Sequence, residues 1–268
     1  MLVCTLGDLT LDVLVRLADP LAVGGDTEAE IRIAPGGQAA NVAAWAASLG
    51  ARARFVGKRG DDEAARLAST GLEAAGVEVL GPAEGRNGVI CSLVSPDGSR
   101  SMAADRGAAV ALRPEELEPA WLERCDHLFV SGYALLFEPA RSAALRAVEL
   151  GRAQGAAVSV DLATWSAIRA AGVSEVRRAV ARVAPDIVFA NESETEIFGT
   201  RSTDALWILK RGARGCAFGE DERPAPPVER VVDTTGAGDA LAAGWIVGGP
   251  DLALEAAARC IQALGAMP

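Results

Sequence analysis

The chain has 268 residues, 50% of them hydrophobic and 23% charged, and a formal net charge of -10. This length suits one large α/β domain or two smaller ones, and the hydrophobic content excludes a disordered chain. Such an acidic chain carries no global field that attracts nucleic acid or an anionic membrane, so we expect neither as a partner.

Cysteine and histidine content limits the redox and metal chemistry. The five cysteines are scattered without a C-x-x-C pair, which favours a reduced cytoplasmic protein over a disulfide framework or a zinc site. The single histidine, His127, excludes a multi-histidine metal centre, and we interpret it as a structural residue of an apolar strand. Asp8 and Asp12 interrupt any signal-peptide pattern, and no apolar run approaches the roughly 18 residues of a membrane span.

Short apolar runs alternate with longer helical patterns along the chain. The predicted strands are 2–7, 52–56, 127–131, 157–161, 187–190 and 206–209, and the predicted helices are 38–49, 61–75, 139–153, 173–183, 238–247 and 252–264. Strands that alternate with helices of ten or more residues predict βαβ units, and therefore a three-layer α/β/α core around a mostly parallel sheet.

Two segments break this alternation. Residues 28–33 alternate polar and apolar side chains, as in a strand with one wet face. Residues 89–94 and 99–103 flank the turn sequence P-D-G at 96–98, which predicts an antiparallel hairpin. We therefore expect a single domain over 1–268, with a small β lid from about 13–33 and 88–106 inserted in the core.

The most informative segment is the glycine-rich turn D-T-T-G-A-G-D at 233–239, which opens an apolar helix. Gly236 and Gly238 lack a Cβ, so an anion can approach the backbone N–H groups and the positive end of the helix dipole. Asp239 at such an anion site suits a base that takes a proton from a hydroxyl, which then attacks a bound phosphorus. The alternative is that Asp239 only caps the helix.

The sequence D-T-T-G-A-G-D-A at 233–240 resembles the C-terminal signature of the ribokinase-like (PfkB) carbohydrate and nucleoside kinases. The segment G-G-Q-A-A-N-V-A at 36–43 is similar to their N-terminal signature, and further family-like pieces follow in the right order. These are Gly7 with Asp12, Gly57 with Gly60-Asp61-Asp62, Asn191 with Glu194, and Gly212 with Gly215. The resemblance covers nearly the whole chain and implies the ribokinase-like fold and an ATP-dependent kinase.

On the donor side, the resemblance implies Asp239 as the catalytic base and the N–H groups of Gly236, Ala237 and Gly238 as an anion hole. The N-x-x-E motif, Asn191 and Glu194, would place Mg²⁺ largely through waters. Without the resemblance, this motif is a helix N-cap with an acid at the third position. The residues expected along the nucleotide are Asn191, Gly212, Gly215 and Thr235, and those expected at a monovalent cation, K⁺, are Asp233 and Thr235.

On the acceptor side, the resemblance implies that Asp12 and Asn41 hydrogen-bond substrate hydroxyls beside Gly36 and Gly37. A carboxylate and an amide suit a polyol, since both can meet neighbouring hydroxyl groups. Arg106 lies where the lid returns to the core and would touch an acidic or phosphorylated acceptor; the alternative is a plain exposed arginine. The lid would exclude water, and its uncovered edges are a candidate homodimer interface.

These features predict phosphorylation of an alcohol group of a small sugar or sugar-like molecule. The alternative within the fold is a nucleoside kinase with a pyrimidine or pseudouridine-like acceptor. A nicotinamide-dependent dehydrogenase is disfavoured because G-D-L-T-L-D, not G-x-G-x-x-G, follows the first strand. Asp239, Asn191 and Glu194 argue against a non-catalytic sensor on the kinase fold. Residues 161–165 lack the D-x-N-x-R pattern of the family's keto-deoxy sugar acid kinases, which disfavours that acceptor.

Overall fold

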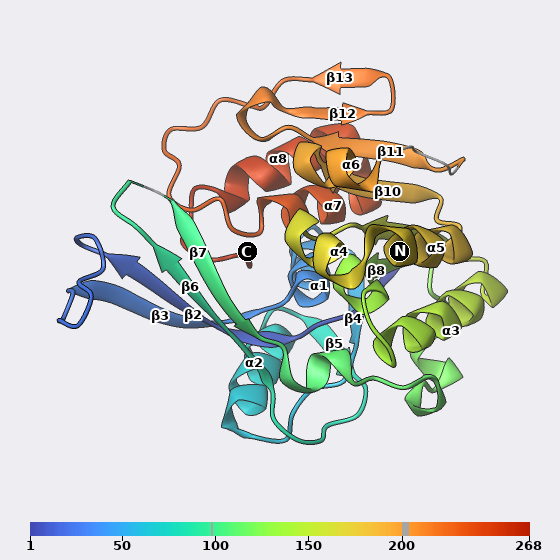
Figure 1. Cartoon of the computed structure of the whole chain (residues 1–268). Coiled ribbons are helices and arrows are strands. Elements are labelled where there is room, and N and C mark those ends of the chain that lie inside the picture. Colours follow the sequence, from blue (N-terminus) through green and yellow to red (C-terminus); the bar gives the residue numbers. More distant parts are fainter. Residues whose placement is uncertain (98, 200–203) are drawn as a thin grey trace.

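The computed structural model describes residues 1–97, 99–199 and 204–268. Within these ranges the strands form a nine-stranded and a four-stranded sheet (Figure 1). The predicted hairpin at 89–103 is present, although Gly98 of its turn lies outside the described residues.

The large sheet has the order β13-β12-β11-β10-β9-β8-β1-β4-β5. The seven strands from β11 to β5 are parallel, and β12 and β13 are antiparallel additions at one edge. The strands are β1 (Leu2–Leu6), β4 (Arg52–Val56), β5 (Val77–Leu80), β8 (His127–Ser131), β9 (Ala157–Asp161), β10 (Ile187–Asn191), β11 (Leu206–Lys210), β12 (Cys216–Phe218) and β13 (Asp221–Arg223).

Helices cover both faces of this sheet, because its central strands are apolar on both sides. In β1, Leu2, Cys4 and Leu6 pack into one core cluster, and Val3 packs into the other. The first cluster includes α3 (Ala140–Ala153), α4 (Trp165–Ala171), α5 (Val173–Val183) and α6 (Glu192–Phe198), and the second includes α1 (Gln38–Ser48), α2 (Glu63–Ala74), α7 (Ala237–Gly248) and α8 (Pro250–Cys260). The predicted three-layer α/β/α core with a mostly parallel sheet is thus confirmed. In the part of the chain that the structure describes, every helix falls short of the length and apolar character that a bilayer crossing requires.

The small sheet, here called the lid sheet, projects from the core (Figure 1). It has the order β3-β2-β6-β7 and consists of β2 (Thr10–Leu17), β3 (Ala29–Gly36), β6 (Gly88–Val94) and β7 (Arg100–Asp105). The sheet begins at Thr10, before the expected start near residue 13, because β2 follows β1 after only a short turn. Asp12 therefore lies within a strand rather than in a surface loop.

The C-terminal helix was predicted too long. It ends at Cys260 rather than at residue 264, because the chain beyond it makes tertiary contacts instead of helical ones. The carbonyl of Ile261 accepts the N–H group of Val232 (2.8 Å), and the N–H group of Gly265 donates to the Asp233 carboxylate (3.1 Å). These contacts attach the last segment to the glycine-rich turn.

Candidate active site

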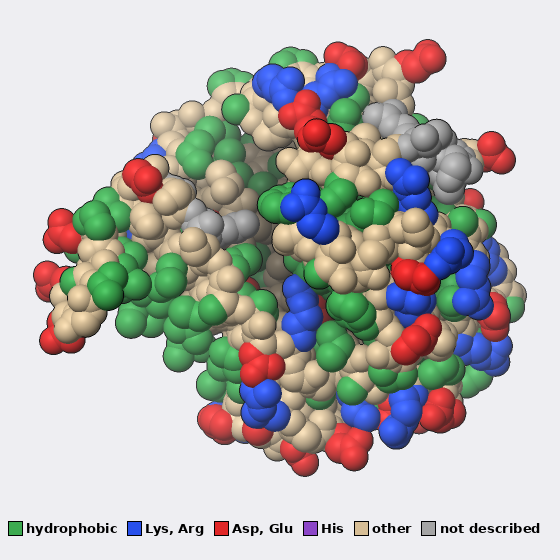
Figure 2. Space-filling model, viewed as in Figure 1, with side chains coloured by type: hydrophobic (Ala, Val, Ile, Leu, Met, Phe, Trp, Pro, Cys, Tyr) green, Lys and Arg blue, Asp and Glu red, His purple; other side chains and the backbone are tan. Residues whose placement is uncertain are grey.

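A cleft of about 550 Å³ runs between the lid sheet and the edge of the large sheet where its parallel strands end (Figure 2). Open α/β sheets bind ligands at this edge. Residues from both ends of the chain line the cleft; the predicted site residues among them are Asp12, Gly37, Asn41, Arg106, Asn191, Glu194, Gly212, Gly215, Thr235, Gly236, Ala237, Gly238 and Asp239. Gly36 and Asp233 are not part of the lining.

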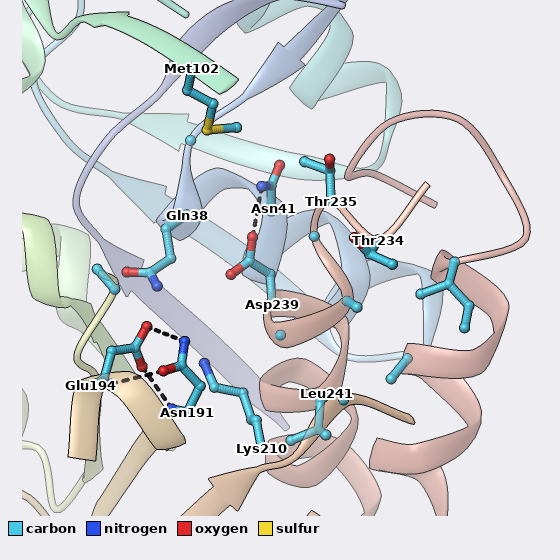
Figure 3. A pocket seen from close by; sticks show the side chains of 18 of the residues that line it. Gln38, Asn41, Met102, Asn191, Glu194, Lys210, Thr234, Thr235, Asp239 and Leu241 are labelled. Carbon is cyan, nitrogen blue, oxygen red and sulfur yellow. Dashed lines mark hydrogen bonds between the residues drawn. The ribbon is translucent and has the colours of Figure 1, made fainter. Parts of the chain in front are cut away.

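The two signatures meet in a direct hydrogen bond. Asn41 Nδ2 in α1 donates to Asp239 Oδ2 in α7 at 2.8 Å, across 198 residues of sequence (Figure 3). The interpretation of Asp239 as a helix cap is wrong, because the N-cap of α7 is Gly236 and no side chain caps the helix. The first turn of α7 therefore has no capping side chain, and its residues Gly236 to Gly238 line the cleft, while Ala237 N has only a long contact of 3.4 Å with the Thr234 carbonyl. The Asp239 carboxylate points toward Asn41.

Glycine is required at the start of α7. Gly236 has a φ of 78°, in the left-handed region, and a Cβ there would lie 2.5 Å from the backbone of Ala266. A Cβ on Gly238 would lie 3.2 Å from Lys210 Nζ. Larger side chains would thus fill the space next to the N–H groups that an anion would approach.

The electrostatic environment of Asp239 disfavours its charged form. Burial of the carboxyl group, together with the nearby negative charge of Asp161, raises the pKa of Asp239 to about 8. The hydrogen bond from Asn41 and the charge of Lys210 oppose this rise. A carboxyl group with a pKa near neutrality is well matched to proton abstraction from an alcohol.

Sequence reasoning missed a charged pair at the ends of β9 and β11. Lys210 Nζ donates to Asp161 Oδ2 at 2.7 Å, and Asp161 is fully buried. Burial lowers the pKa of Lys210, but the charges of Asp161 and Glu194 outweigh it and raise the pKa overall. The signal in the sequence was that Asp161 ends one predicted parallel strand and Lys210 directly follows another, at the edge where open α/β sheets bind ligands.

Asn191 and Glu194 form a capping box at the start of α6. Glu194 N donates to Asn191 Oδ1 (2.9 Å), and Asn191 N and Nδ2 donate to the Glu194 carboxylate (2.8 and 2.7 Å). Burial raises the pKa of Glu194 to about 7, against the opposing charge of Lys210. The helix-cap alternative is therefore confirmed, and the same two side chains line the cleft.

The end of the cleft that contains Asp12 and Asn41, predicted above to bind the acceptor and here called the acceptor end, contains buried polar groups. Asp12 is 8% exposed and accepts from Thr10 Oγ1 at 2.8 Å. Asn41 is 5% exposed, and its Oδ1 has no hydrogen-bond partner among the described residues. Gly36 ends β3 in register with Thr10, and a Cβ on Gly36 would lie 2.2 Å from Asp12 Cγ. A buried acceptor atom without a partner is costly unless a ligand supplies the donor.

Arg106 is not a plain exposed arginine. Its side chain is 26% exposed, its guanidinium lies 3.6 Å from the ring centre of Tyr133, and its Nη1 contacts Asp8 Oδ2 at 3.3 Å. Asp8, Tyr133 and Gln38 line the cleft as well and were not predicted, because an isolated polar residue after a strand carries no sequence signal of its own.

Some of the remaining predicted residues line the cleft, and others order the segments next to it. Gly212 and Gly215 lie in the connection between β11 and β12, both with positive φ. The Asp233 carboxylate accepts Thr235 N (2.9 Å) and Oγ1 (2.6 Å) as well as Gly265 N, so it orders the turn. His127 is buried outside the cleft and hydrogen-bonds Ser159 (2.9 Å), and burial lowers its pKa to about 4, in agreement with a structural role.

The opposite end of the cleft, between the start of α7 and Lys210, is here called the donor end. Its groups suit a nucleoside triphosphate with a bound divalent cation. The uncapped N–H groups of α7 and the ammonium of Lys210 suit phosphate oxygens. Within the described ranges no group of three or more histidine, cysteine or acidic side chains could hold a metal alone. A magnesium ion here would therefore take most of its ligands from phosphates and water, as Mg²⁺ does. The fold and the site together define an α/β phosphotransferase.

Comparison with known proteins identifies the family. The model of the pfkB family carbohydrate kinases matches residues 2–267. The ATP-dependent ribose-1-phosphate kinase of Halopiger xanaduensis is 33% identical over 96% of this chain and 90% of its own length, and fructokinase-1 of Oryza sativa is 34% identical over 78% and 71%. The crystal structure of adenosine kinase from Sinorhizobium meliloti superimposes with a TM-score of 0.86 at 27% identity, covering 99% of this chain and 95% of that one. The chain belongs to the pfkB family and is a sugar or nucleoside kinase with the ribokinase-like fold.

The raised pKa of Asp239 predicts a pH-dependent stability difference. An unfolded aspartate titrates near 4, whereas folded Asp239 titrates at about 8, so between these pH values unfolding releases a proton. The free energy of unfolding therefore falls as pH rises through this window. The Asp239→Asn variant lacks this penalty, and we expect its Tm to exceed that of the wild type by a margin that widens from pH 5.5 to 8.5.

Thermal unfolding of both proteins across this pH range measures the effect. The control is Asp19→Asn, which changes an exposed carboxylate and should give a small difference that is constant with pH. A Tm difference for Asp239→Asn that does not change with pH would contradict the assigned titration.

Proposed function

We propose that this protein transfers the γ-phosphoryl group of ATP to an alcohol group of a small sugar or sugar-like acceptor, with Asp239 as the general base. The observation that carries the proposal is the Asn41–Asp239 hydrogen bond, which joins the acceptor end of the cleft to the uncapped start of α7. The names of the curated relatives, a ribose-1-phosphate kinase and fructokinases, support a sugar acceptor.

The residues support the following sequence. Asp12 and the unpartnered Oδ1 of Asn41 bind hydroxyl groups of the acceptor and direct one of them toward Asp239. Asp239 removes the proton of that hydroxyl as its oxygen forms a bond to the γ-phosphorus, and the bond from this phosphorus to the bridging oxygen of ADP breaks. The N–H groups of Gly236, Ala237 and Gly238 stabilise negative charge on the phosphoryl group during transfer.

Nucleotide and ions occupy the donor end in this proposal. The connection that contains Gly212 and Gly215 follows the nucleotide, with Thr235 on its other side. Asn191 and Glu194 would hold Mg²⁺ through waters, and the bound ion would supply positive charge that offsets the charge of the phosphates. Asp233 orders the turn from behind, and with Thr235 it is our candidate for the site of K⁺.

The acceptor proposed here is a sugar rather than a nucleoside. Among the described residues that line the cleft, the aromatic one is Tyr133, and the Arg106 guanidinium covers a face of its ring. A purine or pyrimidine would therefore have to displace Arg106 before it could stack. Arg106 is also positioned to pair with an acceptor phosphate in exchange for Asp8, which accords with the relative that acts on ribose 1-phosphate.

The first test is turnover against a panel of acceptors. We expect ADP release with a hexose, a pentose or a pentose phosphate to exceed ADP release with nucleosides. With the best acceptor, Asp239→Asn should lower kcat by about 10²–10⁴-fold, and kcat/KM of the wild type should rise with pH toward a plateau above about pH 8, because the base acts when ionised. Near-normal turnover of Asp239→Asn, at unchanged Tm or higher, would refute the base assignment.

The contact between Gly36 and Asp12 supplies a second test. In Gly36→Ala the new methyl group would overlap the Asp12 carboxylate, and Gly36 has no positive φ that would strain the backbone. We expect the carboxylate to move, which raises KM for the acceptor by roughly 10-fold or more and leaves KM for ATP unchanged. Gly25→Ala is the matched control, since its Cβ meets only Ala22 Cβ at 3.6 Å. Equal acceptor KM values in the two variants would count against Asp12.

We also propose that the lid sheet closes over the acceptor and pairs with the lid sheet of a second copy. Its inner face lines the cleft with Asp12, Ile90 and Met102. Its outer face is apolar: Ile31 and Ile33 are each 60% exposed and lie opposite Val15 and Val13 of β2. An apolar face of this kind on a projecting sheet is typical of an interface.

Sedimentation of the purified protein tests this pairing. The wild type should sediment as a dimer at micromolar concentration. The double variant Ile31→Asp/Ile33→Asp should sediment as a monomer, because the dimer would bury the new carboxylates of one copy against those of the other without opposite charges to pair with them. Leu67→Asp, at an exposed apolar residue of α2, is the control and should remain dimeric. A monomeric wild type contradicts the proposal.

A further inference from the structure

Lys210 and Asp161 form a charged pair in the cleft beside the start of α7. Each is the last residue of its strand, and Lys210 is in register with Asn191 of the neighbouring strand. The Nζ–Oδ2 distance is 2.7 Å, and the side chains are 15% and 0% exposed. Asp161 Oδ1 in turn accepts the N–H group of Ala163 at 3.1 Å. The carboxylate is therefore fixed, and it holds the ammonium at one place.

That place is next to the candidate anion hole. The position that a Cβ would take on Gly238 lies 3.2 Å from Lys210 Nζ, so the ammonium lies against the first turn of α7. Figure 3 shows the side chain rising from β11 between the Asn191–Glu194 pair and Asp239. An ammonium has three N–H donors, and the structure gives one of them, to Asp161, among the described residues. Two donors are available to a ligand.

The use of lysine in this chain is itself informative. The sequence has two lysines, Lys58 and Lys210, and all its other basic side chains except that of His127 are arginines. Lys58 is buried between Glu84 and Glu116 and is not part of the cleft lining. A lysine ammonium is a compact charge that can contact a carboxylate and a phosphoryl oxygen at once, whereas a guanidinium is planar and larger. Of the described residues that line the cleft, the cationic ones are Arg106, at the acceptor end, and Lys210.

We propose that Lys210 is a catalytic residue that binds the transferring phosphoryl group, and that Asp161 is the positioning residue that holds its ammonium at the start of α7. This inference rests on the proposed function. During transfer the γ-phosphorus forms a bond to the acceptor oxygen and loses its bond to ADP, Asp239 takes the acceptor proton, and Lys210 donates hydrogen bonds to the oxygens of the phosphoryl group without giving up a proton.

The competing interpretation is a buried ion pair with a purely structural role. The two interpretations differ in nucleotide selectivity, since ADP lacks the phosphoryl group that Lys210 would contact. We expect Lys210→Met to weaken binding of a β,γ-imido analogue of ATP by about 10- to 100-fold, the effect of one charge-assisted hydrogen bond, and to change ADP binding by less than about threefold. Titration calorimetry with Mg²⁺ present measures both affinities. Lys210→Arg should restore part of the selectivity.

Lys210→Met leaves the Asp161 carboxylate buried without its partner, which could unfold the protein. The double variant Lys210→Met/Asp161→Asn removes both charges, and it should keep the fold and show the same loss of selectivity. The control is Lys58→Met/Glu116→Gln, which removes the other buried lysine–carboxylate ion pair. It should leave the ratio of the affinities for the ATP analogue and for ADP unchanged.

The outcomes separate this inference from the kinase proposal. Equal weakening of the analogue and ADP, or no weakening of either, overturns the role of Lys210, while wild-type turnover still supports a kinase. Loss of selectivity in a protein whose wild type phosphorylates no acceptor supports Lys210 as a phosphoryl ligand and rejects the acceptor proposal. A wild type that binds neither nucleotide overturns both.

Discussion

The site depends on the close approach of α1 and α7, which brings Asn41 against Asp239. Both side chains are short, so a 2.8 Å hydrogen bond between them requires the helix backbones to pack tightly. Alanine and glycine make this possible, because the buried faces of both helices consist mainly of these residues. Trp45 Nε1 secures the contact by donating to the carbonyl of Ala266 at 2.8 Å. Residues with low side-chain volume in two segments almost 200 positions apart thus determine the position of the Asp239 carboxylate, our proposed general base.

The buried charges in the cleft are mutually unfavourable in the protein without a ligand. The charge of Asp161 raises the pKa of both Glu194 and Asp239, and all three acids act on a single ammonium, that of Lys210. Desolvation and mutual repulsion raise the pKa of Glu194 and of Asp239, so both carboxyl groups hold their protons up to near neutral pH. In the proposed complex this balance would change, because a cation would offset the acidic groups and a phosphate would lie at the α7 N–H groups. Such an unfavourable constellation is typical of functional sites, where stability is lower than packing alone would allow.

Much of the fold was predictable because its strands are buried on both faces. Such strands appear as short, mostly apolar runs, and six were predicted at close to their observed bounds. The short strands β12 and β13, of three residues each, carry no pattern of that length, and β2 was missed because only a short turn separates it from β1. The glycine-rich turn at the start of α7 was predictable from its residues, since glycines before an apolar helix indicate a candidate anion site. The Lys210–Asp161 ion pair was not predictable, because the two residues meet only through the order and register of the strands. In the sequence, Lys210 is simply a polar residue at the end of an apolar run.

The two ends of the cleft are built by different parts of the molecule, which explains why the fold alone does not define the acceptor. The core supplies the donor end, from the ends of β9, β10 and β11 and from the start of α7. The lid sheet supplies much of the acceptor end, including Asp12, Ile90 and Met102. Substitutions on the lid can therefore change the acceptor without disturbing the phosphoryl-transfer groups, and the similar proteins named for ribose 1-phosphate, fructose and adenosine fit this arrangement. Among the described lid residues that line the cleft, including Ile90, Met102 and Ala104, none has an aromatic ring that could stack a base. The residues of the lid sheet thus favour the proposed sugar acceptor, whereas the residues of the core favour phosphoryl transfer.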